Sequence, residues 1–274
     1  MSLLKHPSGI VGLCLVLIVV VATVLSYVWT PHDPLAVDPR NGWAAPSLTH
    51  LFGTDALGRD LFSAVLVGAR VTLLAATAAT TVAAILGLAL AVAVIVLPQW
   101  AGALLQRWVD ILIAFPTLVL AVILVTSFGA STWIASLAIG LGAAPVVART
   151  IAPELQRAMG SDFALLAIAA GAGTPRLIVR HVLPNAGSTI VVRLTQIMAG
   201  AALGEAGLSY LGFGTPAPTP SWGRLLADLQ SQIMIRPEVL LVPSLCIIIV
   251  VLGFNLLGDG LRDVLDPKTR KARS

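Results

Sequence analysis

The chain has 274 residues, of which 57% are hydrophobic and only 11% are charged, with a formal net charge of +4. Soluble domains carry about 25% charged residues, so these few charges could not cover a soluble surface, and the composition predicts an integral membrane protein. The basic residues are scattered between apolar runs instead of clustering on a polar domain, which argues against nucleic acid as a partner. The two cysteines lie inside apolar runs and form no disulfide or metal-binding pattern.

Stretches without Asp, Glu, Lys or Arg locate the candidate membrane spans, because a spanning helix needs about 20 apolar residues. Residues 7–31 predict a first span near Ile10 to Trp29. Its apolar run is too long for the core of a cleaved signal peptide, so it is expected to remain as an anchor. Residues 71–106 predict a second span, Val71 to Leu97.

Four further spans follow. Residues 111–148 form an uncharged interval of 38 residues, which is too long for one helix. The Gly- and Ser-containing stretch SFGAST at 127–132 divides it into spans three and four. Span five is expected near Ala186 to Leu208, and span six within residues 239–258.

Six spans place both termini on the same side of the membrane. With the N-terminus inside, the inner segments hold eleven Lys and Arg residues and the outer segments hold five. The positive-inside rule therefore predicts that both termini are cytoplasmic. The expected organisation is one all-α transmembrane domain, residues 1–274 with a core at about 68–260, an external loop at 30–68, a cytoplasmic segment at 149–186 and a cytoplasmic tail at 259–274.

The cytoplasmic segment reads as helix, turn, helix. Asp162 is placed to cap a helix that runs through Ala170, and Gly171 is placed to end it. Thr174-Pro175 can begin a second helix, since proline is favoured in the first turn, and Pro184 is expected to end it.

Arg176 and Arg180 are spaced i, i+4 on this second helix. From spacing alone two interpretations remain open. The segment is either a compact docking element for another protein, or a connecting loop whose arginines lie at lipid headgroups.

The segment resembles the cytoplasmic loop of bacterial ABC importer permeases, whose pattern is E-A-A, three residues, G, and about a dozen residues later L-P. Gly171, His181 and Leu183-Pro184 stand where the pattern requires them, but Leu165 and Leu166 replace its Glu and first Ala. In that family the loop fits a groove on the ATPase subunit and transmits its motion. The resemblance therefore assigns ATPase coupling to Leu165, Leu166, Gly171, Arg176, Arg180, His181 and Pro184, with Asp162 as a candidate substitute for the missing glutamate.

Three more stretches narrow the resemblance to the dipeptide/oligopeptide/nickel permeases. They are LFGTDALGRDLFSAVLVGARVTL at 51–73, GEAGLSYLGFGTPAPTPSWGRLL at 204–226 and NLLGDGLRDVLDP at 255–267. The short outer loop after span one is similar to the C-type subunit of such a pair. The resemblance implies a bacterial inner-membrane location, a B-type permease partner, two ATP-binding subunits or one fused ATPase, and an external substrate-binding protein.

The first of these stretches supplies a candidate external motif, Gly53, Thr54, Asp55, Gly58, Arg59 and Asp60. Asp55, Arg59 and Asp60 are expected to form local ion pairs that hold an outer amphipathic helix ahead of span two. The alternative is a solvated loop with ordinary turn chemistry.

Glu205 near the outer end of span five is a candidate gate, because ionisable residues within spans are functional candidates by default; the alternative is a structural partner. Arg193 lies about 18 Å away along the helix, so the two residues are not expected to pair. Trp222 in the following loop is expected either to contact a binding protein or to anchor at the membrane interface.

The function that follows from the resemblance is an ATP-driven importer subunit for small peptides. The chain contains no G-x-x-x-x-G-K-[ST] phosphate loop, so it is expected to be non-catalytic, with ATP and Mg²⁺ bound by its partners. Nickel chelates, haem and opines remain as alternative substrates. A secondary transporter is a competing class, but it would require charges near the middle of the membrane, and five of the six expected spans have none.

Overall fold

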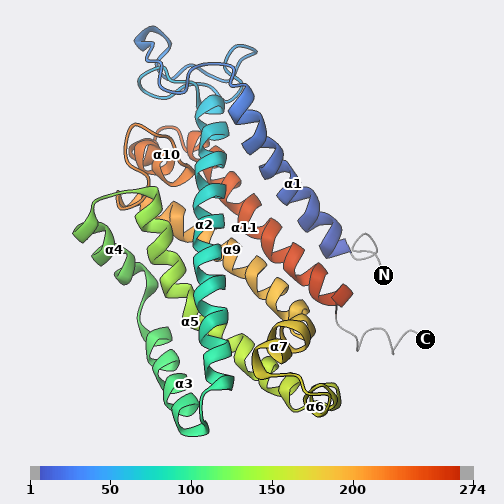
Figure 1. Cartoon of the computed structure of the whole chain (residues 1–274). Coiled ribbons are helices and arrows are strands. Elements are labelled where there is room, and N and C mark those ends of the chain that lie inside the picture. The colour runs from blue at the N-terminus through green and yellow to red at the C-terminus, as the bar shows by residue number, and fades with distance from the viewer. Residues whose placement is uncertain (1–6, 266–274) are drawn as a thin grey trace.

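Residues 7–265 of the chain are described by a computed structural model, and they form a bundle of helices (Figure 1). Within this range the only β-type pairing is one isolated bridge, between Thr54 and Asp60. The long helices are α1 (Pro7–Val28), α2 (Leu61–Val96), α3 (Gln99–Ala114), α4 (Thr117–Phe128), α5 (Thr132–Met159), α9 (Gly187–Tyr210) and α11 (Glu238–Leu265). The short ones are η2 (Pro39–Asn41), α6 (Asp162–Ala169), α7 (Thr174–Leu177), the π-helical turn η3 (Ile178–Val182), α8 (Leu183–Asn185), α10 (Trp222–Leu229) and η4 (Gln230–Gln232).

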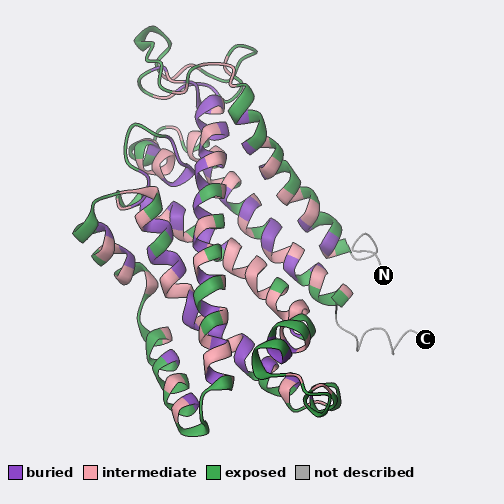
Figure 2. Ribbon diagram, viewed as in Figure 1, coloured by how far each residue is buried: buried purple, intermediate pink, exposed green. Residues whose placement is uncertain are grey.

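The bundle is built to cross a membrane. Helices α1, α2, α5 and α11 are each long and apolar enough to span it, and two bent pairs of helices raise the number of candidate spans to as many as six. Large apolar side chains on α1, such as Val21 and Val24, are more than half exposed, which suits a surface that faces lipid (Figure 2). The prediction of an all-helical membrane protein is confirmed in this form.

Helix α2 begins well before the predicted start of span two at Val71. The uncharged interval was cut short by Arg70, yet the bundle accommodates this charge inside the helix. The Arg70 guanidinium lies 3.9 Å from the centre of the Tyr27 ring and donates to the Ser26 carbonyl oxygen at the end of α1. A single arginine with such partners does not end a helix.

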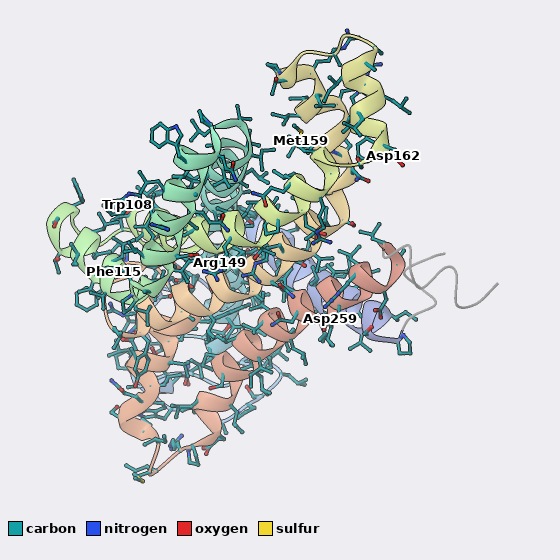
Figure 3. The ribbon with its side chains drawn as sticks, turned by 90° about the horizontal axis from the view of Figure 1, so that it is seen from below. Trp108, Phe115, Arg149, Met159, Asp162 and Asp259 are labelled. Carbon is teal, nitrogen blue, oxygen red and sulfur yellow. The ribbon has the colours of Figure 1, made fainter. Side chains whose placement is uncertain are left out.

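The third predicted span is a broken helix that starts earlier than expected. Helices α3 and α4 are bent by 80° at Phe115 and Pro116. Proline has no N–H to continue the ladder and pushes the preceding residue into an extended conformation, and Phe115 has φ −79° and ψ 123°. Figure 3 shows Phe115 at this break, below the end of α4.

Two boundaries on the predicted cytoplasmic side move along the chain. Helix α5 continues through Arg149 to Met159, so the predicted segment 149–186 is non-spanning structure only from Gly160 onward. Helix α11 likewise continues to Leu265, so the first residues of the predicted tail are helical, and the remainder lies outside the described residues. Arg149, Glu154 and Arg157 lie in the C-terminal part of α5, and Asp259, Arg262 and Asp263 lie in the C-terminal part of α11, so a count of uncharged residues stops before either helix ends.

Small residues bring the helices into close contact. A Cβ on Gly140 of α5 would lie 2.7 Å from the Ala79 carbonyl oxygen of α2, and a Cβ on Gly87 of α2 would lie 2.5 Å from Val147 of α5. Helices α1 and α11 meet in the same way at Gly12. Lipid tails are as apolar as leucine, so close backbone approach and van der Waals packing hold such helices together.

Candidate functional site

The segment from Gly160 to Asn185 projects from one end of the bundle, at the opposite end from the loop that joins α1 to α2 (Figure 1). It follows α5 directly, and Figure 3 shows Met159 and Asp162 at this junction, with α6 extending away from the other helices. Ser161, not Asp162, is the N-cap residue of α6, and its hydroxyl donates to the Ala158 carbonyl oxygen at 2.6 Å. The capping role predicted for Asp162 was therefore wrong by one residue.

Helix α6 ends at Ala169, and Gly171 forms the turn that stops it, as the sequence predicts. Gly171 has φ +84°, its N–H donates to the Ile168 carbonyl oxygen at 2.9 Å, and the Ala172 N–H donates to the Ala167 carbonyl oxygen at 3.0 Å. This pair of bonds defines a Schellman motif, in which the positive-φ position strongly favours glycine. The turn between the two short helices is thus set by one residue.

Replacing Gly171 by valine should distort this turn, because a β-branched residue is strongly disfavoured at positive φ. No atom lies within 4 Å of a Cβ built there, so backbone strain, not a clash, is the expected cause. Asparagine tolerates the same conformation, so Gly171→Asn is the matched control. If the segment couples an ATPase to transport, as the resemblance implies, Gly171→Val should lose most ATP-driven transport and Gly171→Asn should keep most of it, measured as uptake per assembled complex. Equal loss in both variants would contradict this.

The second helix begins as predicted and ends differently. Gly173 precedes α7, and Thr174-Pro175 form its first turn. Helix α7 then opens into the π-helical turn η3, which carries Arg180 and His181. Pro184 was expected to end the second helix, but it lies inside α8. Proline lacks an N–H, and the preceding π turn has already shifted the pattern of backbone hydrogen bonds at this point.

The segment has one face that packs on the bundle and one that is bare. Ala164, Leu177 and Val182 are buried in a cluster with Ile151 and Leu155 of α5. The opposite side exposes a run of apolar residues of α6, with exposed fractions of 57% for Leu165 and 70% for Leu166, together with Phe163 and Ile168. We call these four residues the α6 apolar patch.

Basic residues accompany the patch. Arg176 and Arg180 are exposed and His181 is half-buried. Among the described residues, no ion-pair partner lies within reach of either arginine. The segment therefore offers apolar surface and unpaired positive charge together.

The external motif is a self-supporting loop, not the predicted amphipathic helix. Thr54 is buried, its hydroxyl donates to the Asn41 carbonyl oxygen at 2.5 Å, and it accepts from the Ala44 N–H at 2.8 Å. Gly53 and Gly58 both have φ +74°. A Cβ on Gly58 would overlap the carbonyl oxygen of Asp38, so only glycine allows the backbone at these two positions to come this close.

The predicted ion pairs in this motif form only in part. Arg59 and Asp55 pair at 2.9 Å, as expected. Asp60 instead is the N-cap of α2, where its Oδ2 accepts from the Ser63 N–H at 2.8 Å and the Ser63 hydroxyl at 2.6 Å. Burial acts to raise the pKa of Asp60, but hydrogen bonds from Ser63 and His50 outweigh it and hold that pKa below its ordinary value.

Glu205 is fully buried and joins three parts of the chain. Its Oε1 accepts from the Ser209 hydroxyl at 2.6 Å and the Thr215 hydroxyl at 3.3 Å, and its Oε2 accepts from the Thr72 hydroxyl of α2 at 3.0 Å. Arg193, as expected, does not reach it and donates instead to Gln196. This geometry matches the structural alternative for Glu205, and its partners are the hydroxyl groups of Ser209, Thr215 and Thr72.

Glu205→Gln should preserve assembly, because hydroxyl groups can rotate to accept from the new amide. Glu205→Ala leaves three buried hydroxyls without their acceptor, and each such group costs about 1–3 kcal/mol. We therefore expect a clear fall in thermal stability for alanine and a small one for glutamine. Melting in detergent and uptake by the assembled complex should be measured together. Loss of uptake in a fully stable Glu205→Gln protein would contradict a purely structural role.

Trp222 is not an interfacial anchor. Its side chain is buried, and its indole N–H donates to the Val65 carbonyl oxygen of α2 at 3.0 Å. The ring covers Gly68, where any Cβ would lie 2.6 Å from it. The tryptophan is inside because the loop after α9 folds back over α2, a return path that carries no local sequence signal.

A polar cavity of about 530 Å³ lies near the C-terminal end of α5 and was not predicted. Three helices contribute basic residues to it: Arg157 from α5, Arg193 from α9 and Arg262 from α11. Glu154 lines it as well and pairs with Arg157 at 2.6 Å. Its lining residues are spread over more than a hundred positions of the chain, from Thr150 to Arg262, so only the packing of the helices reveals it.

Fold and composition define a polytopic membrane protein with a short helical segment that projects from one end. Residues 83–271 match the protein family described as "Binding-protein-dependent transport system inner membrane component". The chain belongs to this family, and it is a permease subunit, the non-catalytic inner-membrane component of an ABC transporter that works with ATPase and binding-protein partners.

Similar proteins cover nearly the whole chain. The dipeptide transport system permease protein DppC of Alkalihalophilus pseudofirmus is 36% identical over 98% of this chain and 88% of its own length. A putative peptide transport system permease protein of Brucella abortus is 39% identical over 98% of this chain and 90% of its own length. The glutathione transport system permease protein GsiD of Escherichia coli is 36% identical over 97% of this chain and 88% of its own length.

Proposed function

We propose that this chain is the C-type permease of an importer for small peptides, with six spans, cytoplasmic termini, and the segment from Gly160 to Asn185 docked in a groove of an ATPase subunit. The observation that carries the docking is the α6 apolar patch. Leu165 and Leu166 are more than half exposed on a projecting helix. A bare apolar surface away from the lipid-facing helices is the kind of surface that a protein partner covers.

Leu165 and Leu166 make this contact apolar, whereas the family pattern has Glu and Ala at these two positions. Arg176 and Arg180 flank it with positive charge that has no partner within the described residues. An ATPase groove that fits this segment would therefore have an apolar floor and an acidic rim. Asp162, exposed at the start of α6, is placed to meet a donor of the same partner.

The ATPases would act on the pore through this contact. They bind ATP and Mg²⁺ and approach one another when they do so, as two chains or as one fused chain. The docked segment follows that motion, and the buried side of α6 and α7 carries it into α5 through Ile151 and Leu155. A B-type permease would complete the pathway across the membrane, and an external binding protein would deliver the substrate.

Small peptides are proposed as the substrates because the relatives named above transport dipeptides, peptides or glutathione. The test is uptake of a labelled dipeptide by vesicles that contain the permease pair, its ATPase and its binding protein. We expect uptake to require ATP and to stop with vanadate. Uptake driven by a proton gradient without ATP would reject the mechanism, whereas ATP-driven uptake of a nickel chelate or haem but no peptide would reject only the substrate.

The orientation follows from the excess of basic residues on one set of loops, eleven against five. In a background with Cys14 and Cys246 replaced by alanine, Thr219→Cys should react with a membrane-impermeant thiol reagent in intact cells. Thr174→Cys should react only after the membrane is opened. Both threonines are exposed, so access and not burial decides the result. The reverse pattern would invert the topology.

A further inference from the structure

Two histidines and an aspartate meet in the loop between α1 and α2, outside the coupling segment and outside the helix contacts described above. His50 Nδ1 lies 3.0 Å from Asp60 Oδ1, and His32 Nδ1 lies 3.8 Å from Asp60 Oδ2. The three ligand-type atoms all lie within 4.8 Å of one another. The two imidazole rings are stacked, with centroids 4.6 Å apart and an angle of 28° between their planes.

His32 lacks a hydrogen bond where it needs one. Its Nδ1 atom is buried, and it has no hydrogen-bond partner among the described residues. A buried polar atom without a partner costs free energy and calls for an explanation. The nearest polar group is the Asp60 carboxylate at 3.8 Å, which is too long for a hydrogen bond.

Ser63 holds the cluster in place. Its N–H and hydroxyl both bond to Asp60 Oδ2, so Oδ1 faces the rings and lies within hydrogen-bond distance of His50 Nδ1. The same Ser63 oxygen accepts from the backbone N–H of His32 at 3.1 Å, so one residue fixes both the carboxylate and the chain that carries His32. Outer groups that orient ligands in this way are typical of metal sites.

We propose that His32, His50 and Asp60 bind one divalent transition-metal ion of the zinc class. Two imidazole nitrogens and one carboxylate oxygen are ligands that such ions accept, at about 2.0–2.2 Å each. In a tetrahedral site these atoms stand about 3.3 Å apart, so a small inward movement of His32 completes the set. Both imidazoles must carry their proton on Nε2, and a water molecule would fill the remaining position of a four-coordinate ion.

The bound ion would tie together three points of the loop. His32 follows the end of α1, His50 lies in the middle of the loop, and Asp60 begins α2. The site thus cross-links the chain before the external motif to Asp60, the last residue of that motif. Metal binding does not depend on the proposed transport function, although its location outside the cytoplasm does depend on the proposed orientation.

The test uses the full-length chain in detergent, purified without a polyhistidine tag, stripped with a chelator and then given Zn²⁺ alone. We expect one zinc per chain to remain after gel filtration, and Co²⁺ to give visible absorption bands of a nitrogen- and oxygen-ligated site. His32→Gln and His50→Gln should each weaken binding at least tenfold. Asp60→Asn should do so too while keeping the α2 cap, because asparagine is also a favoured N-cap residue.

His181→Gln and Asp33→Asn serve as matched controls, since the first removes a distant histidine and the second an exposed carboxylate next to His32. Both should bind zinc as the unmodified chain does. Melting temperatures of all variants without metal show whether each is folded, and zinc should raise the melting temperature only where it binds. Absence of zinc from the unmodified chain, or binding that is unchanged in both histidine variants, overturns the proposal in favour of a metal-free histidine–aspartate pairing.

Discussion

Leu166→Asp should detach the ATPase from this permease while leaving the permease itself folded. The leucine side chain is 70% exposed in the chain alone, so the substitution removes little from the bundle, and surface changes of this kind usually alter stability by less than about 0.5 kcal/mol. Burying a leucine in the ATPase groove contributes roughly 1.5–3 kcal/mol. An unpaired carboxylate in the same place adds a further cost.

The combined loss should exceed about 2.8 kcal/mol, which is a hundredfold in affinity. The loss of affinity is measured by co-purification of the ATPase with the permease, and its effect on transport by vanadate-sensitive uptake. Leu165→Asp should act in the same direction. Gln99→Asp is the matched control, since it adds the same charge to an exposed position at the N-terminus of α3, outside the segment from Gly160 to Asn185, where negative charge is tolerated. Normal ATPase binding and uptake in both leucine variants would show that the α6 apolar patch is not the docking surface.

Gly140→Val should destabilise the bundle strongly, because it places a branched side chain where two spanning helices touch. Its Cβ would lie 2.7 Å from the Ala79 carbonyl oxygen and 2.7 Å from the Val82 side chain, so α2 and α5 would have to move apart. Overpacking of this kind costs typically about 1–3 kcal/mol, and the backbone contact places the cost near the upper end. A fall in melting temperature on the order of 10 °C is expected.

Gly200→Ala separates this effect from the general cost of changing a helical glycine. Nothing lies within 4 Å of a Cβ at Gly200, and alanine favours helix by about 1 kcal/mol over glycine. Its melting temperature in detergent should be equal to or slightly above that of the unmodified chain. Equal destabilisation by both variants would mean that the α2–α5 contact does not limit stability.

Uncharged intervals located the spans because charges inside a membrane are costly, and they failed where a charge has partners. Arg70 lies within α2, held by Ser26 and Tyr27. Arg149 pairs with Asp110 across α5 and α3. Each pairing joins residues dozens of positions apart, so sequence spacing alone could not reveal that the helices pass through these charges.

The local signals performed better than the long-range ones. Gly171 and Thr174-Pro175 set a turn and a helix start through their own backbone preferences, and both were predicted. The burial of Trp222 and the cluster of His32, His50 and Asp60 depend on how the loops fold back, which no motif records. For that reason the turn and helix start of the segment from Gly160 to Asn185 could be predicted from sequence, and the histidine–aspartate cluster could not.

Helix α5 connects the hydrogen bonds around Glu205 to the segment that projects from the bundle. At one end, Thr132 lies 3.1 Å from Thr215, a partner of Glu205, through their hydroxyl groups. At the other end, Leu155 is buried against the segment that projects from the bundle. Thr132 and Leu155 lie 23 residues apart on this helix, which is about 35 Å along its axis. A displacement of the projecting segment would therefore reach the Glu205 hydrogen bonds along one continuous helix, in which Pro145 and Pro153 are the positions where it can bend.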